Sequence, residues 1–342
     1  MFGDLRLKYN DALHETVTGL KARDDIVGIF TFGSYARGTL TPRSDLDVFA
    51  ILEKEPEESR RIEVRNNIVV DIFFSSIDTF EKVFNDKEDS VIKIASIIFP
   101  LKTALIVWDP EKKVKTYFDK AKEYKWNPEQ IDLFKAEALE KFDAVADIVD
   151  EGDTETGIHV LRQGVLALGK VVQMRNNSFD ILTPSRTLDE VRIFSPLVYE
   201  TFLRTFLLRG ADADTLLDVS KEIKAWVDET KERIEKSDTE HKKKLFDLVL
   251  EAHDELETAI DNIYGDDTEM AMLQIQYTLS KLGKTLLLLE GIDIVDDADL
   301  IKELRKLNHP FLQVLLNQGK YQIQPREVKR YASEATFLAQ RI

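Results

Sequence analysis

Several residue types and patterns are scarce or missing in this chain, and each absence excludes a class of protein. There is no cysteine among the 342 residues, so disulfide bonds and thiolate metal sites are excluded. Basic residues are outnumbered 47 to 63, which gives a formal charge of -16 and no overall attraction to nucleic acid. No apolar run approaches the roughly 20 residues that span a bilayer, and the first residues lack a signal-peptide layout. We therefore expect a cytoplasmic protein without a membrane partner.

Three aspartates stand in or beside apolar segments that predict strands. Asp45 and Asp47 lie two residues apart in the alternating segment 45–52, so in a strand they share one face. Asp71 interrupts the apolar run 68–74, where an unpaired carboxylate would be costly. Converging carboxylates repel one another unless a cation neutralises them. Two Mg²⁺ ions, with Mn²⁺ as the alternative, would bind such a set together with substrate phosphates.

A Gly-Ser turn precedes the aspartate pair. Gly33 and Ser34 end the predicted strand 26–32; glycine lets backbone approach a phosphate, and Ser34 adds N–H groups and a hydroxyl at the start of a short helix. Arg37 lies on the same helical side and is a candidate phosphate contact. Taken singly, these residues also suit an ordinary turn and a solvated arginine, so the hypothesis depends on their combination.

The combination resembles a known signature. Gly33-Ser34, ten intervening residues, Asp45-Leu46-Asp47 and the later Asp71 are similar to the pattern of the nucleotidyltransferase superfamily related to DNA polymerase beta. Gly-Ser-Tyr-Ala-Arg-Gly and Ser-Asp-Leu-Asp most resemble small prokaryotic members, both minimal and kanamycin-type antibiotic transferases. The resemblance covers about the first third of the chain. It implies catalytic and metal-binding roles for the three aspartates and nucleotide contacts from the Gly-Ser turn and Ser44.

Such enzymes move a nucleoside monophosphate from an NTP, here expected to be ATP, to an acceptor hydroxyl and release pyrophosphate. The fold class that we predict is α+β: a small mixed β-sheet domain over residues 1–125, followed by a large all-α helical bundle region. Arg65-Asn66-Asn67 predicts a hairpin turn between two strands, and Trp126-Asn127-Pro128 marks the junction.

The helical region carries an internal repeat. Asp153-Thr154-Glu155 recurs 114 positions later as Asp267-Thr268-Glu269, and Leu168-Gly169-Lys170 recurs at the same offset. We interpret the repeat as a duplicated bundle with units at 126–238 and 239–342, the alternative being coincidental alignment of helical stripes.

The first helical unit is expected to supply further nucleotide contacts, for which Arg162 and Lys170 are the candidates. Because Lys284 repeats Lys170 far from the catalytic domain in sequence, Leu-Gly-Lys also fits a packing motif. The acceptor is unknown; a small molecule or a protein is favoured over nucleic acid, and the helical region is a candidate homodimer interface. The alternative function is a regulatory protein that controls a partner, as an antitoxin does.

Overall fold

The computed structural model describes residues 2–42, 44–239, 241–294 and 296–342. The chain divides into two compact units, one ending at Trp126 and the other beginning at Asn127. The first holds a small mixed sheet and the second is helical, which confirms the predicted α+β fold class.

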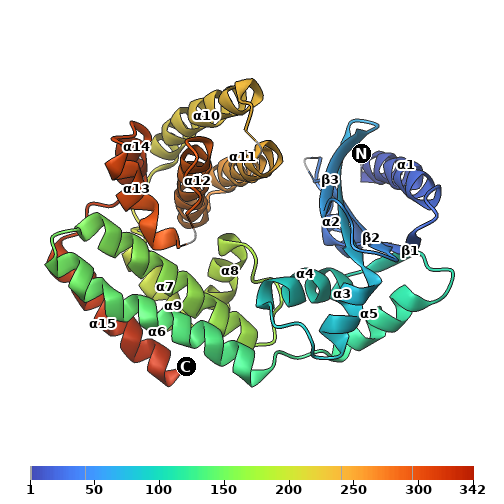
Figure 1. The fold of residues 1–342 in the computed structure, drawn as a ribbon, viewed down its shortest axis with the longest axis horizontal. Helices are drawn as coiled ribbons and strands as arrows, with labels where there is room; N and C mark the ends of the chain where they lie inside the picture. Colours follow the sequence, from blue (N-terminus) through green and yellow to red (C-terminus); the bar gives the residue numbers. More distant parts are fainter. Residues whose placement is uncertain (1, 43, 240, 295) are drawn as a thin grey trace. The chain divides into compact units, whose positions relative to one another are not determined.

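The first unit is built on a five-stranded sheet, of which β1, β2 and β3 are labelled in Figure 1, and its strand order is β3-β4-β2-β1-β5. Strands β2 and β4 run parallel, and the other neighbouring pairs run antiparallel. The elements are α1 (Phe2–Lys21), β1 (Ile26–Thr31), α2 (Gly33–Arg37), β2 (Leu46–Leu52), β3 (Arg60–Arg65), β4 (Ile68–Ser76), α3 (Ile77–Phe84), α4 (Val91–Lys102), β5 (Leu105–Trp108) and α5 (Lys113–Glu123).

Alternation along β2 and β4 gives the sheet two apolar faces. Leu46, Val48 and Ile72 belong to a core that also contains buried residues of α1. On the opposite face Phe49 packs against Phe73, with ring centroids 6.3 Å apart. The period of two therefore places the aspartates that precede these phenylalanines, at positions 47 and 71, on the face turned away from α1.

The hairpin between β3 and β4 turns at the predicted asparagines. Asn66 and Asn67 have φ angles of 52° and 63°, the left-handed conformation that a two-residue hairpin turn requires. The turn fixes the antiparallel register of β3 on β4, in which Ile62 lies opposite Asp71. Helix α5, which we did not predict, begins after Lys112 and packs Val114 close to Gly28 of β1.

The second unit consists of helices throughout its described residues. They are α6 (Pro128–Asp150), α7 (Thr154–Arg175), α8 (Pro184–Phe194), α9 (Pro196–Thr205), α10 (Ala213–Lys236), α11 (Lys242–Tyr264), α12 (Thr268–Leu289), the 3-10 turn η1 (Asp297–Asp299), α13 (Leu300–Lys306), α14 (Phe311–Gln318) and α15 (Pro325–Arg341). None of the helices among the described residues of the chain combines the length and apolarity that crossing a bilayer demands.

Helix positions in this unit recur at the offset seen in the sequence. The first residues of α6 and α11 lie 114 positions apart, and so do their last residues. The N-cap residues of α7 and α12 are separated by the same number of positions. Asp153 and Asp267 accept hydrogen bonds from the backbone N–H groups of Thr156 and Met270, so the two caps are built alike.

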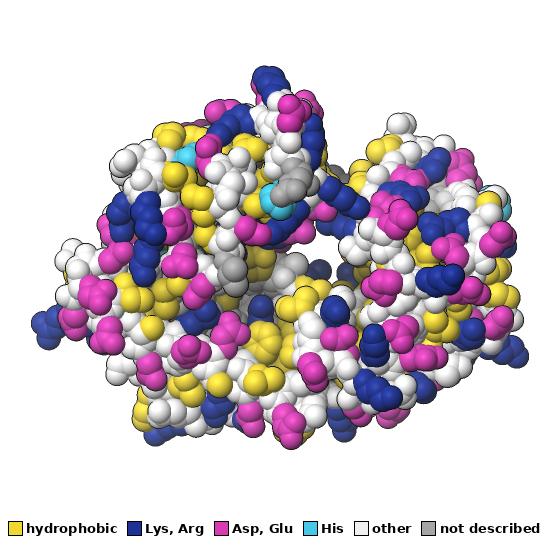
Figure 2. All heavy atoms as spheres, in the orientation of Figure 1, with side chains coloured by type: hydrophobic (Ala, Val, Ile, Leu, Met, Phe, Trp, Pro, Cys, Tyr) yellow, Lys and Arg dark blue, Asp and Glu magenta, His cyan; other side chains and the backbone are white. Residues whose placement is uncertain are grey.

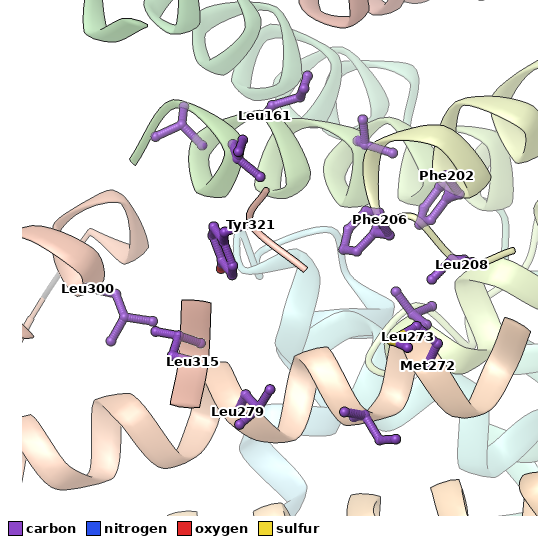
Figure 3. Close-up of a cluster of buried hydrophobic side chains, with 14 of the residues drawn as sticks. Leu161, Phe202, Phe206, Leu208, Met272, Leu273, Leu279, Leu300, Leu315 and Tyr321 are labelled. Carbon is purple, nitrogen blue, oxygen red and sulfur yellow. The ribbon is translucent and has the colours of Figure 1, made fainter. Parts of the chain in front are cut away.

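Each of the two predicted halves of the helical unit packs its last helix on the other half. Helix α15 packs on α6 and α7, whereas α10 packs on α11 and α12. Side chains from both halves, such as Leu161 and Phe202 from the first and Leu279 and Leu315 from the second, converge in one core (Figure 3). Residues 127–342 therefore form one compact unit, and the division near residue 239 stays a prediction about the repeat.

Candidate functional site

The sheet brings the three predicted aspartates together. Asp47 of β2 and Asp71 of β4 are direct neighbours in the parallel register, and Asp45 immediately precedes β2. Each offers one carboxylate oxygen, and these three oxygens all lie within 4.8 Å of one another. Asp71 is buried, Asp47 is half-buried and Asp45 is exposed, so the cluster opens from the interior of the sheet to its surface.

The turn after β1 fixes the position of Asp47. The Thr31 hydroxyl donates a 2.6 Å hydrogen bond to the Asp47 carbonyl, which also accepts from the backbone N–H of Phe32. Gly33 has a φ of 67°, and a Cβ at this position would lie 2.9 Å from the Asp47 Cγ. The glycine therefore provides both the left-handed turn and the space that the Asp47 carboxylate occupies.

The remaining predicted residues of this unit surround the turn in different ways. The Ser34 hydroxyl oxygen is buried and has no hydrogen-bond partner among the described residues. Arg37 is exposed at the end of α2, and its charge offsets a small part of the rise in the pKa of Asp47 that burial and the neighbouring carboxylates cause. Ser44 organises the loop before Asp45: its hydroxyl accepts from the Thr41 N–H at 3.0 Å, and its carbonyl accepts from the buried Tyr9 hydroxyl.

Among the three aspartates, Asp47 shows how the cluster shifts a carboxyl pKa. Burial, together with the neighbouring carboxylates of Asp45 and Asp71, raises the pKa of Asp47 far above its usual range, and Arg37 and Arg60 offset only part of this. Arg60 of β3 pairs with Asp71 directly: its Nε donates to Oδ1 at 2.9 Å and its Nη2 to Oδ2 at 2.7 Å. The cluster thus concentrates negative charge in a partly dehydrated place.

The donor set fits a hard divalent cation. Its members are oxygen ligands only, they converge within the span of a coordination sphere, and the exposed side leaves room for water or phosphate oxygens. A cation would also relieve the repulsion that raises the pKa of Asp47. Asp45, Asp47 and Asp71 are therefore the residues that could hold such an ion.

Arg162 and Lys170, the other predicted nucleotide contacts, belong to helix α7 of the second unit. The buried Arg162 guanidinium donates to three backbone carbonyls, those of Thr205, Gly319 and Lys320, at 2.6 to 3.0 Å. Burial lowers the pKa of Lys170, which lies over the Phe134 ring and lines a cavity of about 150 Å³. Helix packing thus already uses the Arg162 guanidinium, and a nucleotide contact from Lys170 stays a prediction.

Three residues that position the site were not predicted from the sequence. Thr31 and Tyr9 hold the backbone of the Asp47 strand and of the Ser44 loop, and Arg60 holds the Asp71 side chain. A signal for Arg60 did exist: the asparagine turn sets the hairpin register, which puts residue 62 opposite Asp71 and residue 60 one step along the same face.

Known proteins resemble this chain in the region of the cluster. Residues 13–139, which include all three aspartates, match the nucleotidyltransferase domain family. A Methanocaldococcus jannaschii protein named as a candidate protein adenylyltransferase is 30% identical over 120 residues, covering 33% of this chain and 80% of the relative. The crystal structure of a nucleotidyltransferase-like protein from Exiguobacterium sibiricum matches 90% of this chain and 89% of its own, with a TM-score of 0.39 and 12% identity.

Proposed function

The chain belongs to the nucleotidyltransferase family and is a nucleotidyltransferase enzyme, and from this premise we propose that it moves AMP from ATP to an acceptor hydroxyl in a Mg²⁺-dependent reaction. The observation that carries the proposal is the convergence of three carboxylate oxygens within 4.8 Å beside a Gly-Ser turn. This arrangement supports phosphoryl transfer for two reasons. The carboxylates can hold cations that neutralise a triphosphate, and the Gly-Ser turn lets backbone N–H groups approach the phosphates closely.

In the proposed reaction the acceptor oxygen bonds to the α-phosphorus while the bond to pyrophosphate breaks. Pyrophosphate leaves with the electron pair of that bond, and a carboxylate oxygen of Asp71 takes the hydroxyl proton. Asp45, Asp47 and Asp71 hold the divalent ions, two by our proposal, which when bound supply positive charge to the triphosphate and to the acceptor oxygen. The buried Ser34 hydroxyl donates to a phosphate oxygen and so gains the partner that it lacks among the described residues.

Arg37 and Ser44 complete the proposed nucleotide contacts. Arg37 is exposed and close enough to Asp47 for its charge to offset part of the rise in the pKa of that carboxyl group, so the same charge is available to a triphosphate at the cluster. Ser44 acts by fixing the loop that presents Asp45, because its hydroxyl is hydrogen-bonded to Thr41.

For the acceptor we propose a protein side-chain hydroxyl. The relative named for protein adenylylation supports this class. The charge distribution disfavours a long nucleic acid: the net charge is -16, and on the face drawn in Figure 2 the Lys and Arg side chains stand among Asp and Glu side chains.

A label-transfer assay tests the proposal. Protein, Mg²⁺ and each α-labelled NTP are incubated with fractionated cell extract, and labelled protein is separated from labelled small molecules. We expect label from ATP in the protein fraction, and a loss of at least about a hundredfold in Asp45→Asn or Asp71→Asn. The matched control is Asp78→Asn, which removes an exposed carboxylate of the same unit that pairs with Lys82 at 2.6 Å, and it should keep full activity.

Two results would contradict the proposal in different ways. Full Mg²⁺-dependent activity in Asp45→Asn would show that the cluster is not the catalytic centre. Binding of ATP without transfer to any fraction would favour the regulatory alternative.

A further inference from the structure

Arg60 forms an ion pair with Asp71, the most buried aspartate of the cluster. Its Nε lies 2.9 and 3.0 Å from the two carboxylate oxygens of Asp71, and its Nη2 lies 2.7 Å from Oδ2. Both oxygens that Asp71 can offer to a cation therefore already accept hydrogen bonds from a guanidinium. This is the bidentate geometry in which arginine binds carboxylates most strongly.

The pair is asymmetric in its exposure to solvent. The Asp71 side chain is 5% exposed, whereas the Arg60 side chain is 34% exposed and lies over the Phe73 ring at the edge strand β3. A buried carboxylate needs a positive partner, but a half-exposed arginine regains hydration when it moves outward. The pair can therefore exchange its cation at the cost of moving one surface side chain.

We propose that Arg60 is an exchangeable counter-ion of the metal site: it holds Asp71 charged and in place while no ion is bound, and it yields Asp71 when a divalent cation enters. The inference rests on the proposed function, because it assumes that the three aspartates hold the metal. It follows from charge and geometry, since a guanidinium and a divalent ion on the same carboxylate repel each other. Arg60 is thus a positioning residue that sets how tightly the site binds metal.

Metal titration of the full chain tests the proposal without an activity assay. Mn²⁺ alone is titrated into the wild type, Arg60→Gln and Arg60→Lys by calorimetry, and the melting temperature is measured in metal-free buffer. We expect Arg60→Gln to bind Mn²⁺ at least about tenfold more tightly, because a competing charge is gone. The same variant should melt a few degrees lower without metal, because Asp71 loses its bidentate pair with Arg60. Arg60→Lys keeps the charge but loses the bidentate pair, so its Mn²⁺ affinity should lie nearer to the wild type than that of Arg60→Gln, with a melting temperature between the two.

The opposite signs of the two effects distinguish this role from a purely structural one. A merely structural Arg60 would lower both stability and metal affinity when replaced, so unchanged or weaker Mn²⁺ binding by Arg60→Gln overturns the proposal. If no protein binds Mn²⁺, the metal site of the proposed function is overturned and this inference falls with it.

A measurement on the wild type covers the case in which Arg60→Gln does not fold. The Arg60 Nε–H signal is followed by ¹⁵N NMR, with Arg60→Lys for its assignment, while Mg²⁺ is added. We expect the signal to be protected from solvent exchange without metal and to lose that protection as Mg²⁺ saturates the site. Protection that persists at saturation would overturn the proposal.

Discussion

Replacing Gly33 with alanine tests how closely the Gly-Ser turn is fitted to the cluster. The added Cβ would lie 2.9 Å from the Asp47 Cγ, whereas carbon atoms pack at about 3.5 Å or more, so the carboxylate must retreat by about 1 Å at its oxygen end. A displacement of about 1 Å in a reacting group typically costs about a hundredfold in rate. The φ of 67° adds about 1 kcal/mol of backbone strain. We expect Gly33→Ala to lose about a hundredfold in label transfer and to bind Mn²⁺ more weakly.

Gly38 supplies the matched control for this substitution. It ends the same short helix with a φ of 73°, yet a Cβ there would meet nothing within 4 Å. Gly38→Ala therefore carries similar backbone strain without the clash with Asp47. We expect it to lose about the same stability in urea unfolding and to keep most of its transfer activity and its Mn²⁺ affinity. Equal losses in the two variants would refute the reasoning, because strain alone would then explain both.

Three further predictions concern residues whose contacts could not be predicted from the sequence. Tyr9→Phe removes the hydroxyl that donates to the Ser44 carbonyl; we expect a loss of about 1 kcal/mol in urea unfolding and a reduced transfer rate, because the loop before Asp45 loosens. His159→Gln should reduce the loss of folding stability at acid pH. Burial lowers the pKa of His159 from 6.5 to about 4, so between these pH values the unfolded chain binds a proton at this histidine and the folded chain does not. Stability is then complete above pH 6.5 and falls by about 3 kcal/mol towards pH 4 in the wild type, which denaturation at several pH values would measure against the variant. Arg162→Gln should lose about 2 to 4 kcal/mol of stability with an unchanged affinity for ATP in calorimetry; weaker ATP binding by the folded variant would restore Arg162 to the nucleotide site.

The sequence predicted the family and the sheet because both depend on local patterns. Alternation around Asp47 and the apolar run around Asp71 indicated strands, and the asparagine pair indicated the turn that the structure has. The resemblance based on the Gly-Ser turn and the Ser-Asp-Leu-Asp segment is confirmed by the family match over residues 13–139. The metal, nucleotide and acceptor assignments stay predictions, because no ligand chemistry is fixed by strand patterns.

Interactions that depend on register or on three-dimensional proximity could not be predicted in the same way. The close approach of Gly33 to the Asp47 carboxylate can be predicted only if β1 and β2 are known to be neighbours. The ion pair of Arg60 with Asp71 can be predicted only if the register of β3 on β4 is known. The exchange of α10 and α15 between the helical halves leaves no trace in a hydrophobic stripe, because a stripe shows that a helix is covered but not by which helix.

The predicted repeat at the offset of 114 residues shows why an inward-facing arginine is ambiguous in a sequence. Arg162 and Gln276 lie 114 positions apart on α7 and α12, and the Gln276 amide donates to the Phe206 carbonyl at 2.7 Å. Arg162 donates to the carbonyl of Lys320, which lies 114 positions after Phe206, and also reaches the Thr205 carbonyl in the first half. Side chains at matching positions thus each bind a matching backbone turn in the other half, and Arg162 also binds the Thr205 carbonyl in its own half. A buried guanidinium needs oxygen acceptors, and carbonyl ends of helices supply them as well as phosphates do, so only the fold can tell the two apart.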